Sequence, residues 1–113
     1  MEAVSYTFAA EPAAPFLHLD NRALILSNGA QSAMFSGNAL PFIAESLDIL
    51  AEEGRATRRH GAAVFGGFRL EGGAFTLFGG SADRLISLCV DARTFADLRA
   101  AVTHQVRAGV QLP

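Results

Sequence analysis

The stretch FRLEGGAFTLFGG, residues 68–80, resembles an earlier stretch, LHLDNRALILSNG, residues 17–29, in its order of apolar and turn residues. In both, apolar residues alternate on either side of a two-residue turn pair, Gly72-Gly73 in one and Asp20-Asn21 in the other. This pattern is typical of a β-hairpin. Each stretch ends in a second turn pair, so we expect a further strand after each. The second pairs are Asn28-Gly29 and Gly79-Gly80.

Around the earlier stretch the pattern predicts four strands and a helix. The helix is expected over residues 39–53, because apolar residues there recur at intervals of three and four. Asn38 is the candidate N-cap, and Gly54 is the candidate residue that ends the helix. The expected strands are 4–8, 16–19, 22–27 and 31–36.

The same order of signals follows in the second half. Asp91 is a candidate cap for a second amphipathic helix, and Gly109 is its expected end. The glycine pair at 66–67 is interpreted as a break between two short strands. The expected strands are 62–65, 68–71, 74–78 and 84–90.

The two halves can be superposed on one another. A shift of 51 positions places Leu24 on Phe75, with matching apolar phase and turns. A shift of 55 positions places Ile43 on Leu98 in the helices. We therefore predict an α+β fold made of a duplicated ββββα unit, with antiparallel sheets and two amphipathic helices. The halves would span about 4–54 and 62–109 of a single domain, residues 1–113. The alternative is an ordinary α+β domain whose hairpins look alike.

Composition limits the classes of function. The chain has 113 residues, half of them hydrophobic, and a net charge of −2, so it can form a core of its own. All nine basic residues are arginine. Two explanations remain open: a coding bias, or selection for guanidinium contacts to phosphate or carboxylate.

The sequence also gives little indication of a disulfide, a reactive thiol or a membrane-spanning segment. Cys89 is the single cysteine, so no intramolecular disulfide is possible, and no base or cation next to it in sequence would activate a thiol. The N-terminus lacks the pattern of a signal peptide, and no apolar run approaches the length of a membrane span. We expect a cytoplasmic protein with no membrane partner.

On the predicted sheets, the helices would cover one face and leave the other to solvent. The outward positions expected from alternation are His18 with Arg69, Ile25 with Thr76, and Ser27 with Phe78. This face mixes cationic, titratable, hydroxyl and apolar groups, and it is a candidate surface for a partner.

The order ββββα-ββββα, over about residues 4–107, resembles the Whirly fold, and one half resembles the C-terminal domain of the transcriptional positive coactivator family. The resemblance implies single-stranded DNA binding. It is one of element order only, with no sequence motif, so no functional residue is carried over. The chain departs from these families in being shorter than a typical Whirly domain, acidic and free of lysine.

The basic segment RATRRHG, residues 55–61, is expected to be a link between the halves. Its cations can line a groove for a nucleic-acid backbone, with nearby phenylalanines as stacking platforms. The alternative is a solvated loop that offsets the acidic end of the first helix. The cations are Arg55, Arg58, Arg59 and His60 in the link, joined by Arg22, Arg69 and Arg84, and the aromatic candidates are Phe16, Phe65 and Phe78.

No residue pattern indicates a cofactor, a metal or catalysis. His18, His60 and His104 lack metal-ligand spacing, and the glycine pairs fit hairpins better than phosphate loops. The acidic residues are interpreted as caps and surface charges. We therefore predict a non-catalytic protein that binds single-stranded nucleic acid. The alternative is a protein-interaction module: an adaptor, a regulator or a small inhibitor. Self-association through exposed strand edges fits either.

Overall fold

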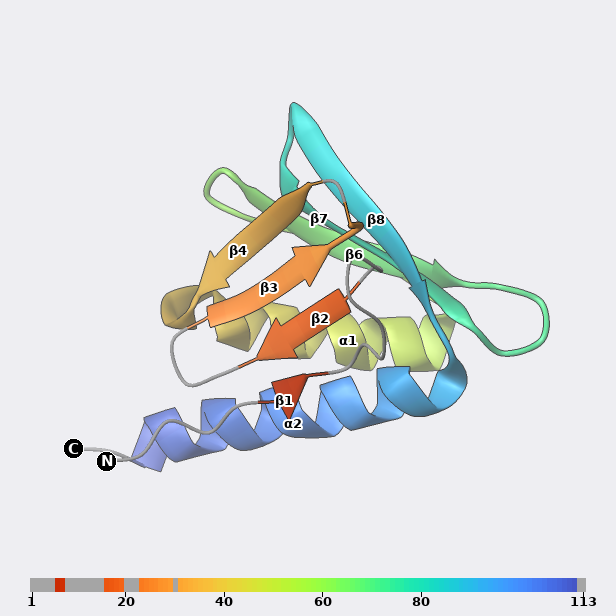
Figure 1. The fold of residues 1–113 in the computed structure, drawn as a ribbon. Coiled ribbons are helices and arrows are strands. Elements are labelled where there is room, and N and C mark those ends of the chain that lie inside the picture. The colour runs from red at the N-terminus through yellow and green to blue at the C-terminus, as the bar shows by residue number, and fades with distance from the viewer. Residues whose placement is uncertain (1–5, 8–15, 20–22, 30, 112–113) are drawn as a thin grey trace.

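The computed structural model of the chain describes residues 6–7, 16–19, 23–29 and 31–111, and it forms two four-stranded antiparallel sheets, each followed by a helix (Figure 1). The first half contains β1 (Tyr6–Thr7), β2 (Phe16–Leu19), β3 (Ala23–Ser27), β4 (Ser32–Ser36), a short 3₁₀ turn η1 (Gly37–Ala39) and α1 (Leu40–Glu53). The second half contains β5 (Arg55–His60), β6 (Ala63–Arg69), β7 (Phe75–Ser81), β8 (Arg84–Val90) and α2 (Ala92–Gln111).

The predicted α+β class and the doubled ββββα order are confirmed. Sheet A has the strand order β1-β2-β3-β4, and sheet B has the order β5-β6-β7-β8, so every strand pairs with its neighbour in sequence. No helix lies among the described residues between positions 62 and 90. Neither described helix is both long enough and apolar enough to cross a bilayer.

One core joins the two halves. The inward face of sheet A is a block of leucines, and residues 17, 19, 24 and 26 are at most 1% exposed. These leucines share a buried cluster with the apolar stripe of α1, the inward residues of sheet B and the first turns of α2. In Figure 1, sheet A lies in front of α1 and of part of sheet B, and α2 runs along the bottom of the view.

Sheet A packs closely on sheet B at a glycine. A Cβ placed on Gly79 of β7 would lie 2.7 Å from the ring of Phe35 on β4, so only glycine leaves room for this ring. Phe35 is held in turn by edge-to-face contacts with Phe42 of α1 and Phe65 of β6, with ring centroids 6.4 Å and 5.8 Å away. This glycine belongs to β7, so the predicted turn at Gly79-Gly80 is wrong.

The helix ends are partly as predicted. Gly54 takes a left-handed conformation with φ 82°, and its N–H donates to the carbonyl of Leu50 at 2.9 Å, which confirms it as the end of α1. Asp91 is confirmed as a cap, since its carboxylate accepts the N–H of Thr94 at 2.7 Å. Asn38 is not the N-cap: it lies inside η1, and α1 begins two residues later with Pro41 in its first turn.

Three other predictions require correction. The segment at 55–60 is not a loop but the edge strand β5, paired along its whole length with β6. The glycines at 66–67 lie inside β6, so the expected strands at 62–65 and 68–71 are one strand. The second helix runs past Gly109 to residue 111, because glycine weakens a helix by only about 1 kcal/mol and need not end it.

Candidate nucleic-acid interface

The basic segment at 55–60 is divided between two faces, because alternate side chains of a strand point to opposite sides. Ala56 is buried beneath α1, so Arg58 and His60 share its side of the sheet. Arg55 and Arg59 point the other way. The four cations that were expected to act together are therefore two pairs on opposite faces of sheet B.

The inward pair is already engaged with α1. Arg58 forms an ion pair with Glu45, with nitrogen and oxygen 2.7 Å apart. His60 stacks on the ring of Phe42, with centroids 5.3 Å apart and planes 12° apart. These two side chains hold the polar edge strand against α1, and neither is available on the open face of the sheet.

Arg69 is also on the inward side, contrary to the prediction. Its guanidinium lies 5.4 Å from the centroid of the Phe75 ring and donates to the carbonyl of Ala51 at 2.7 Å. A cation at this place offsets the negative end of the α1 dipole. The correction follows from the continuous β6: Phe65 is fully buried, so alternation places Phe68 outward and Arg69 inward.

The outer face of sheet B, defined as the side away from α1 and sheet A, carries the remaining cations and the exposed aromatic groups. Among the described residues, three large apolar side chains are exposed, and two of them, Phe68 at 42% and Leu85 at 48%, lie on this face. No helix or strand of the described part of the chain covers the outer face of sheet B. Its side chains come from Arg55, Thr57, Arg59, Val64, Phe68, Thr76, Phe78, Leu85, Ser87 and Cys89, and of these only Val64 is buried.

The strand register sets the spacing of these groups. Arg55 is directly opposite Phe68 in the β5–β6 pair. In the β6–β7 pair Phe68 is opposite Thr76, and Phe78 lies two residues further along β7. Phe68 and Phe78 are therefore diagonal neighbours, whose residue positions are typically about 7–8 Å apart. A cation and two rings therefore follow one another across adjacent strands.

A glycine fixes the position of the Phe78 ring. Gly66 is the cross-strand partner of Phe78, and a Cβ at Gly66 would lie 2.9 Å from the end of that ring. The same Cβ would lie 2.1 Å from the carbonyl oxygen of Ala56. Glycine thus allows β5 and the Phe78 ring to close over the backbone of β6, and the ring stays half-exposed on the outer face.

Charge is segregated between the sheet and the helices. The strands of sheet B contain no aspartate or glutamate. They carry five of the nine arginines of the chain. The acidic residues nearest in sequence lie on α1 and in the turns at 71, 83 and 91. Arg55 and Arg59 make no ion pair with any residue of the described part of the chain.

The other predicted site residues do not join this face. His18 is half-buried on sheet A, where it pairs with Ile25. Ser27 was expected outside but is 6% exposed, and its hydroxyl accepts the N–H of Gly29 at 3.1 Å. Phe65, a candidate stacking platform, is fully buried. Arg22 and the side chain of Phe16 lie outside the described residues.

Two acidic side chains have perturbed pKa values for local reasons. The N–H of Thr94, reinforced by the Thr94 hydroxyl, holds the pKa of Asp91 below its ordinary value. The hydroxyl of Ser81 does the same for Asp83, with its oxygen 2.7 Å from the carboxylate. Both carboxylates are structural acceptors at turns, and this confirms their interpretation as caps and surface charges.

Metal-ligating side chains do not cluster in the described part of the chain, and the cysteine lies on the surface. Over the described ranges, no three histidine, cysteine, aspartate or glutamate residues gather as metal ligands would. Cys89 is exposed on the outer face, and its sulfur lies 3.5 Å from the Thr76 hydroxyl.

Comparison with solved structures finds two chains with this fold. A chain of a guide-RNA-binding protein complex bound to a guide RNA has a TM-score of 0.57 and 12% identity, and the match covers 97% of this chain and 92% of that one. A chain of MRP1/MRP2 from Trypanosoma brucei has a TM-score of 0.54 and 12% identity, over 96% of this chain and 86% of that one. No family model and no curated protein matches the sequence. At this identity the likeness shows the fold alone, and the resemblance to the Whirly fold by name stays a prediction.

Proposed function

We propose that the outer face of sheet B binds single-stranded nucleic acid and catalyses no reaction. The observation that carries the proposal is the presence of two outward arginines, Arg55 and Arg59, beside two outward rings, Phe68 and Phe78, on a face that no described element covers. Cations with neighbouring aromatic platforms are the two components of a surface that holds a strand without reading its sequence.

Each component has a separate part in binding. Guanidinium groups pair with phosphate oxygens and release the counterions condensed on the strand, so their contribution falls as salt rises. Aromatic rings stack on the faces of bases, and this contribution depends little on salt. The absence of carboxylates from the strands of sheet B removes the repulsion that an acidic neighbour would add.

The geometry favours single strands over duplexes. Phe68 and Phe78 project from a sheet, and their rings can stack only on bases whose faces are free. In a duplex those faces are already stacked. We therefore expect a single strand to use both the arginines and the rings, and a duplex to use the arginines alone.

The fold likeness supports the proposal. One of the two similar solved chains belongs to a guide-RNA-binding protein complex bound to a guide RNA, and the other belongs to MRP1/MRP2. For this chain the choice between RNA and DNA is made by the experiment.

The test is a fluorescence-anisotropy titration of labelled poly-pyrimidine strands of RNA and of DNA, alone and paired with their complements, across a series of salt concentrations. We expect single strands to bind more tightly than duplexes, with affinity that declines steadily with salt. Phe68→Ala should weaken single-strand binding, and His104→Ala is its control, because His104 carries an exposed ring on α2, away from the outer face of sheet B. No binding at protein concentrations of about 100 µM in low salt, the weak end of non-specific affinity, would refute the proposal.

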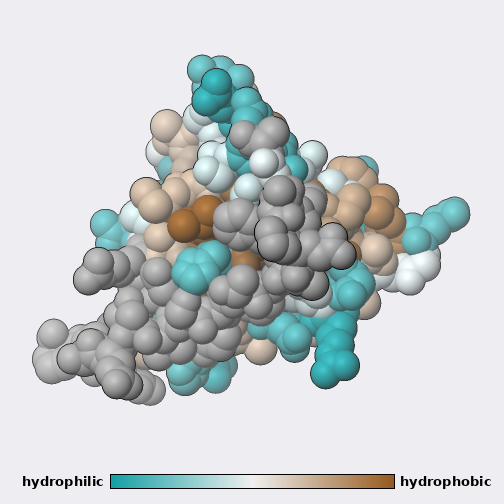
Figure 2. Space-filling model, viewed as in Figure 1, coloured by the Kyte–Doolittle hydropathy of each residue, from teal (hydrophilic) through white to brown (hydrophobic). Residues whose placement is uncertain are grey.

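A second candidate function rests on the outer face of sheet A. Met34 is the most exposed large apolar side chain among the described residues, and Ile25 is its direct cross-strand partner. Figure 2 shows an apolar area over β3 and β4 in this view. A protein partner on this area would be retained in pull-downs after nuclease treatment and would be lost with Met34→Ser, whereas Arg55→Gln would leave it unchanged.

A further inference from the structure

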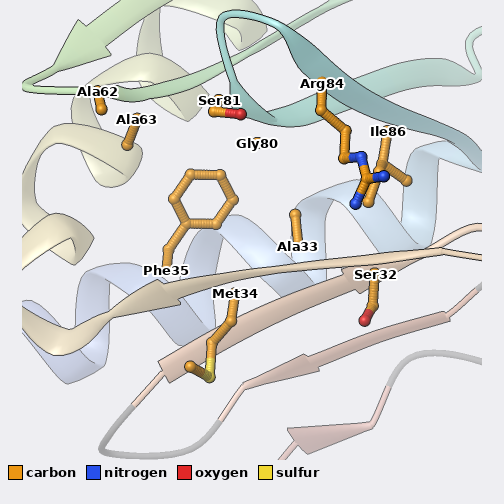
Figure 3. A pocket seen from close by; sticks show the side chains of 10 residues that line it. All are labelled: Ser32, Ala33, Met34, Phe35, Ala62, Ala63, Gly80, Ser81, Arg84 and Ile86. Atoms are coloured by element: carbon orange, nitrogen blue, oxygen red, sulfur yellow. The ribbon is translucent and has the colours of Figure 1, made fainter.

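A cavity of about 340 Å³ opens where sheets A and B diverge, on the inward side of sheet B and away from its outer face. We call it the junction pocket. Its walls are β4 on one side and the adjoining ends of β6, β7 and β8 on the other, as Figure 3 shows. It is lined by Ser32, Ala33, Met34, Phe35, Ala62, Ala63, Gly80, Ser81, Arg84 and Ile86.

The junction pocket has an apolar floor and a single charged wall residue. Its floor is formed by small and aliphatic side chains with the Phe35 ring, and that ring cannot turn away, because Phe42 and Phe65 hold it from two sides. Arg84 is the one charged residue in the lining. In Figure 3 its side chain extends from β8 toward β4, so the guanidinium lies across the gap between the sheets.

The charge of Arg84 is available to a ligand. Within the described ranges Arg84 makes no ion pair and no side-chain hydrogen bond. Its neighbour Asp83 is not part of the lining. The charge of Arg84 helps to lower the pKa of Asp83, but it does so less than the Ser81 hydroxyl, whose oxygen lies 2.7 Å from that carboxylate. The Ser81 hydroxyl adds a polar group to the lining, whereas the Ser32 hydroxyl points away from Arg84 in Figure 3.

We propose that the junction pocket binds a nucleoside monophosphate, with its planar base between the two sheets and its phosphate on Arg84. The cavity lies within the volume range of small-molecule sites. The apolar lining, which includes the Phe35 ring, suits a flat heterocycle, and the guanidinium fork matches the oxygens of a phosphate bidentately. The nucleotide is either free or the phosphorylated end of a strand, and only the second source rests on the function proposed for sheet B.

The test is NMR titration of the ¹⁵N-labelled chain with uridine 5′-monophosphate, uridine and ribose 5-phosphate. We expect the monophosphate to shift the amide signals of residues 32–35 and 80–86, and the two fragments to bind more weakly, since each lacks one half of the ligand. Arg84→Gln should weaken the monophosphate at least about tenfold, because a charge-assisted pair is lost. Arg84→Lys should fall in between, since it keeps the charge but not the fork.

Arg93→Gln is the matched control, because Arg93 is exposed in the first turn of α2, beyond β8, and its replacement makes the same change in net charge. It should bind the monophosphate like the unaltered chain. Unchanged amide signals at 32–35 and 80–86, or equal affinity in Arg84→Gln and the unaltered chain, would overturn the assignment.

The source of the nucleotide is decided by strands with a 5′-phosphate and strands with a 5′-hydroxyl. A larger response of the pocket amides to the phosphorylated strand assigns the pocket to strand ends, and an equal response assigns it to free nucleotide. If no strand binds but the monophosphate does, the function proposed for sheet B is refuted and the assignment of the junction pocket stands. Strands that bind the outer face while the monophosphate leaves the pocket amides unchanged would refute the pocket alone.

Discussion

Replacing Arg55 and Arg59 together by glutamine tests which face of sheet B contacts the phosphates. Both side chains are exposed on the outer face and have no ion-pair partner among the described residues. Their loss should therefore weaken binding to single strands without destabilising the fold. Because these residues act through phosphate neutralisation, the effect should be largest at low salt.

The size of the effect follows from the number of cations removed. Each phosphate contact to a single strand contributes about −0.7 to the slope of log affinity against log salt. The double variant should therefore have a slope shallower by about 1.4 if each arginine neutralises one phosphate. Over a fourfold rise in salt, the unaltered chain would then lose about sevenfold more affinity than the variant.

The assay is the anisotropy titration at four or more salt concentrations, with Arg93→Gln/Arg107→Gln as the matched control. The control removes the same charge from exposed positions of α2. It should shift affinity slightly at low salt and leave the slope unchanged. If the two double variants change the slope equally, binding responds to net charge alone, and the argument for the outer face is wrong.

Three further predictions concern the rings, the sheet junction and one carboxylate. Phe68→Ala should weaken single-strand binding by about 1–3 kcal/mol with no change in the salt slope, measured in the same titration. Gly79→Ala should cost about 1–3 kcal/mol in urea unfolding, because its Cβ meets the fixed Phe35 ring, and Phe35→Leu in the same chain should recover part of the loss. The pKa of Asp91 is lowered by folding, so its contribution to stability is complete above the ordinary value of 3.8 and is lost as pH falls through the lowered value. Asp91→Asn should remove that part of the acid destabilisation, measured by urea unfolding at neutral pH and at about pH 2.

Elements with a strong period or a specific end residue could be predicted from the sequence. The interval of three and four in the apolar residues of α1 gave its span to within one residue, and Gly54 marked its end through a backbone conformation that other residues rarely adopt. Strand β8 alternates between buried and exposed residues along its length, and the predicted range, 84–90, is the observed one.

The edge strand β5 could not be predicted because its burial has no period of two. Only Ala56 is buried in RATRRH, and the inward positions after it are taken by Arg58 and His60. Backbone hydrogen bonds to β6 and side-chain contacts with α1 hold this strand in place. Neither kind of contact can be recognised in the sequence. Arginines along an edge also hinder pairing with another chain.

One ambiguous glycine pair exchanged the predicted faces of Phe68 and Arg69. Gly66-Gly67 has the composition of a turn, yet both residues lie in a strand where neighbouring groups approach too closely for a Cβ. Interpreting the pair as a turn shifted the phase of the following residues by one, and a shift of one residue moves every side chain to the opposite face. Phe68 was thereby assigned to the core and Arg69 to the surface, the reverse of what the structure shows.

The net charge of −2 is a poor guide to how this chain meets a polyanion, because the charges are separated in space. Two of the four acidic residues of α1, Glu45 and Asp48, are paired with Arg58 and Arg99 at 2.7 and 2.8 Å. The whole helix also lies on the opposite side of sheet B from Arg55 and Arg59. Packed layers are about 10 Å apart, and the Debye length at physiological salt is about 8 Å. Glu45 and Asp48 are therefore paired and distant from the outer face, and Arg55 and Arg59 are the charges on that face with no ion-pair partner in the described part of the chain.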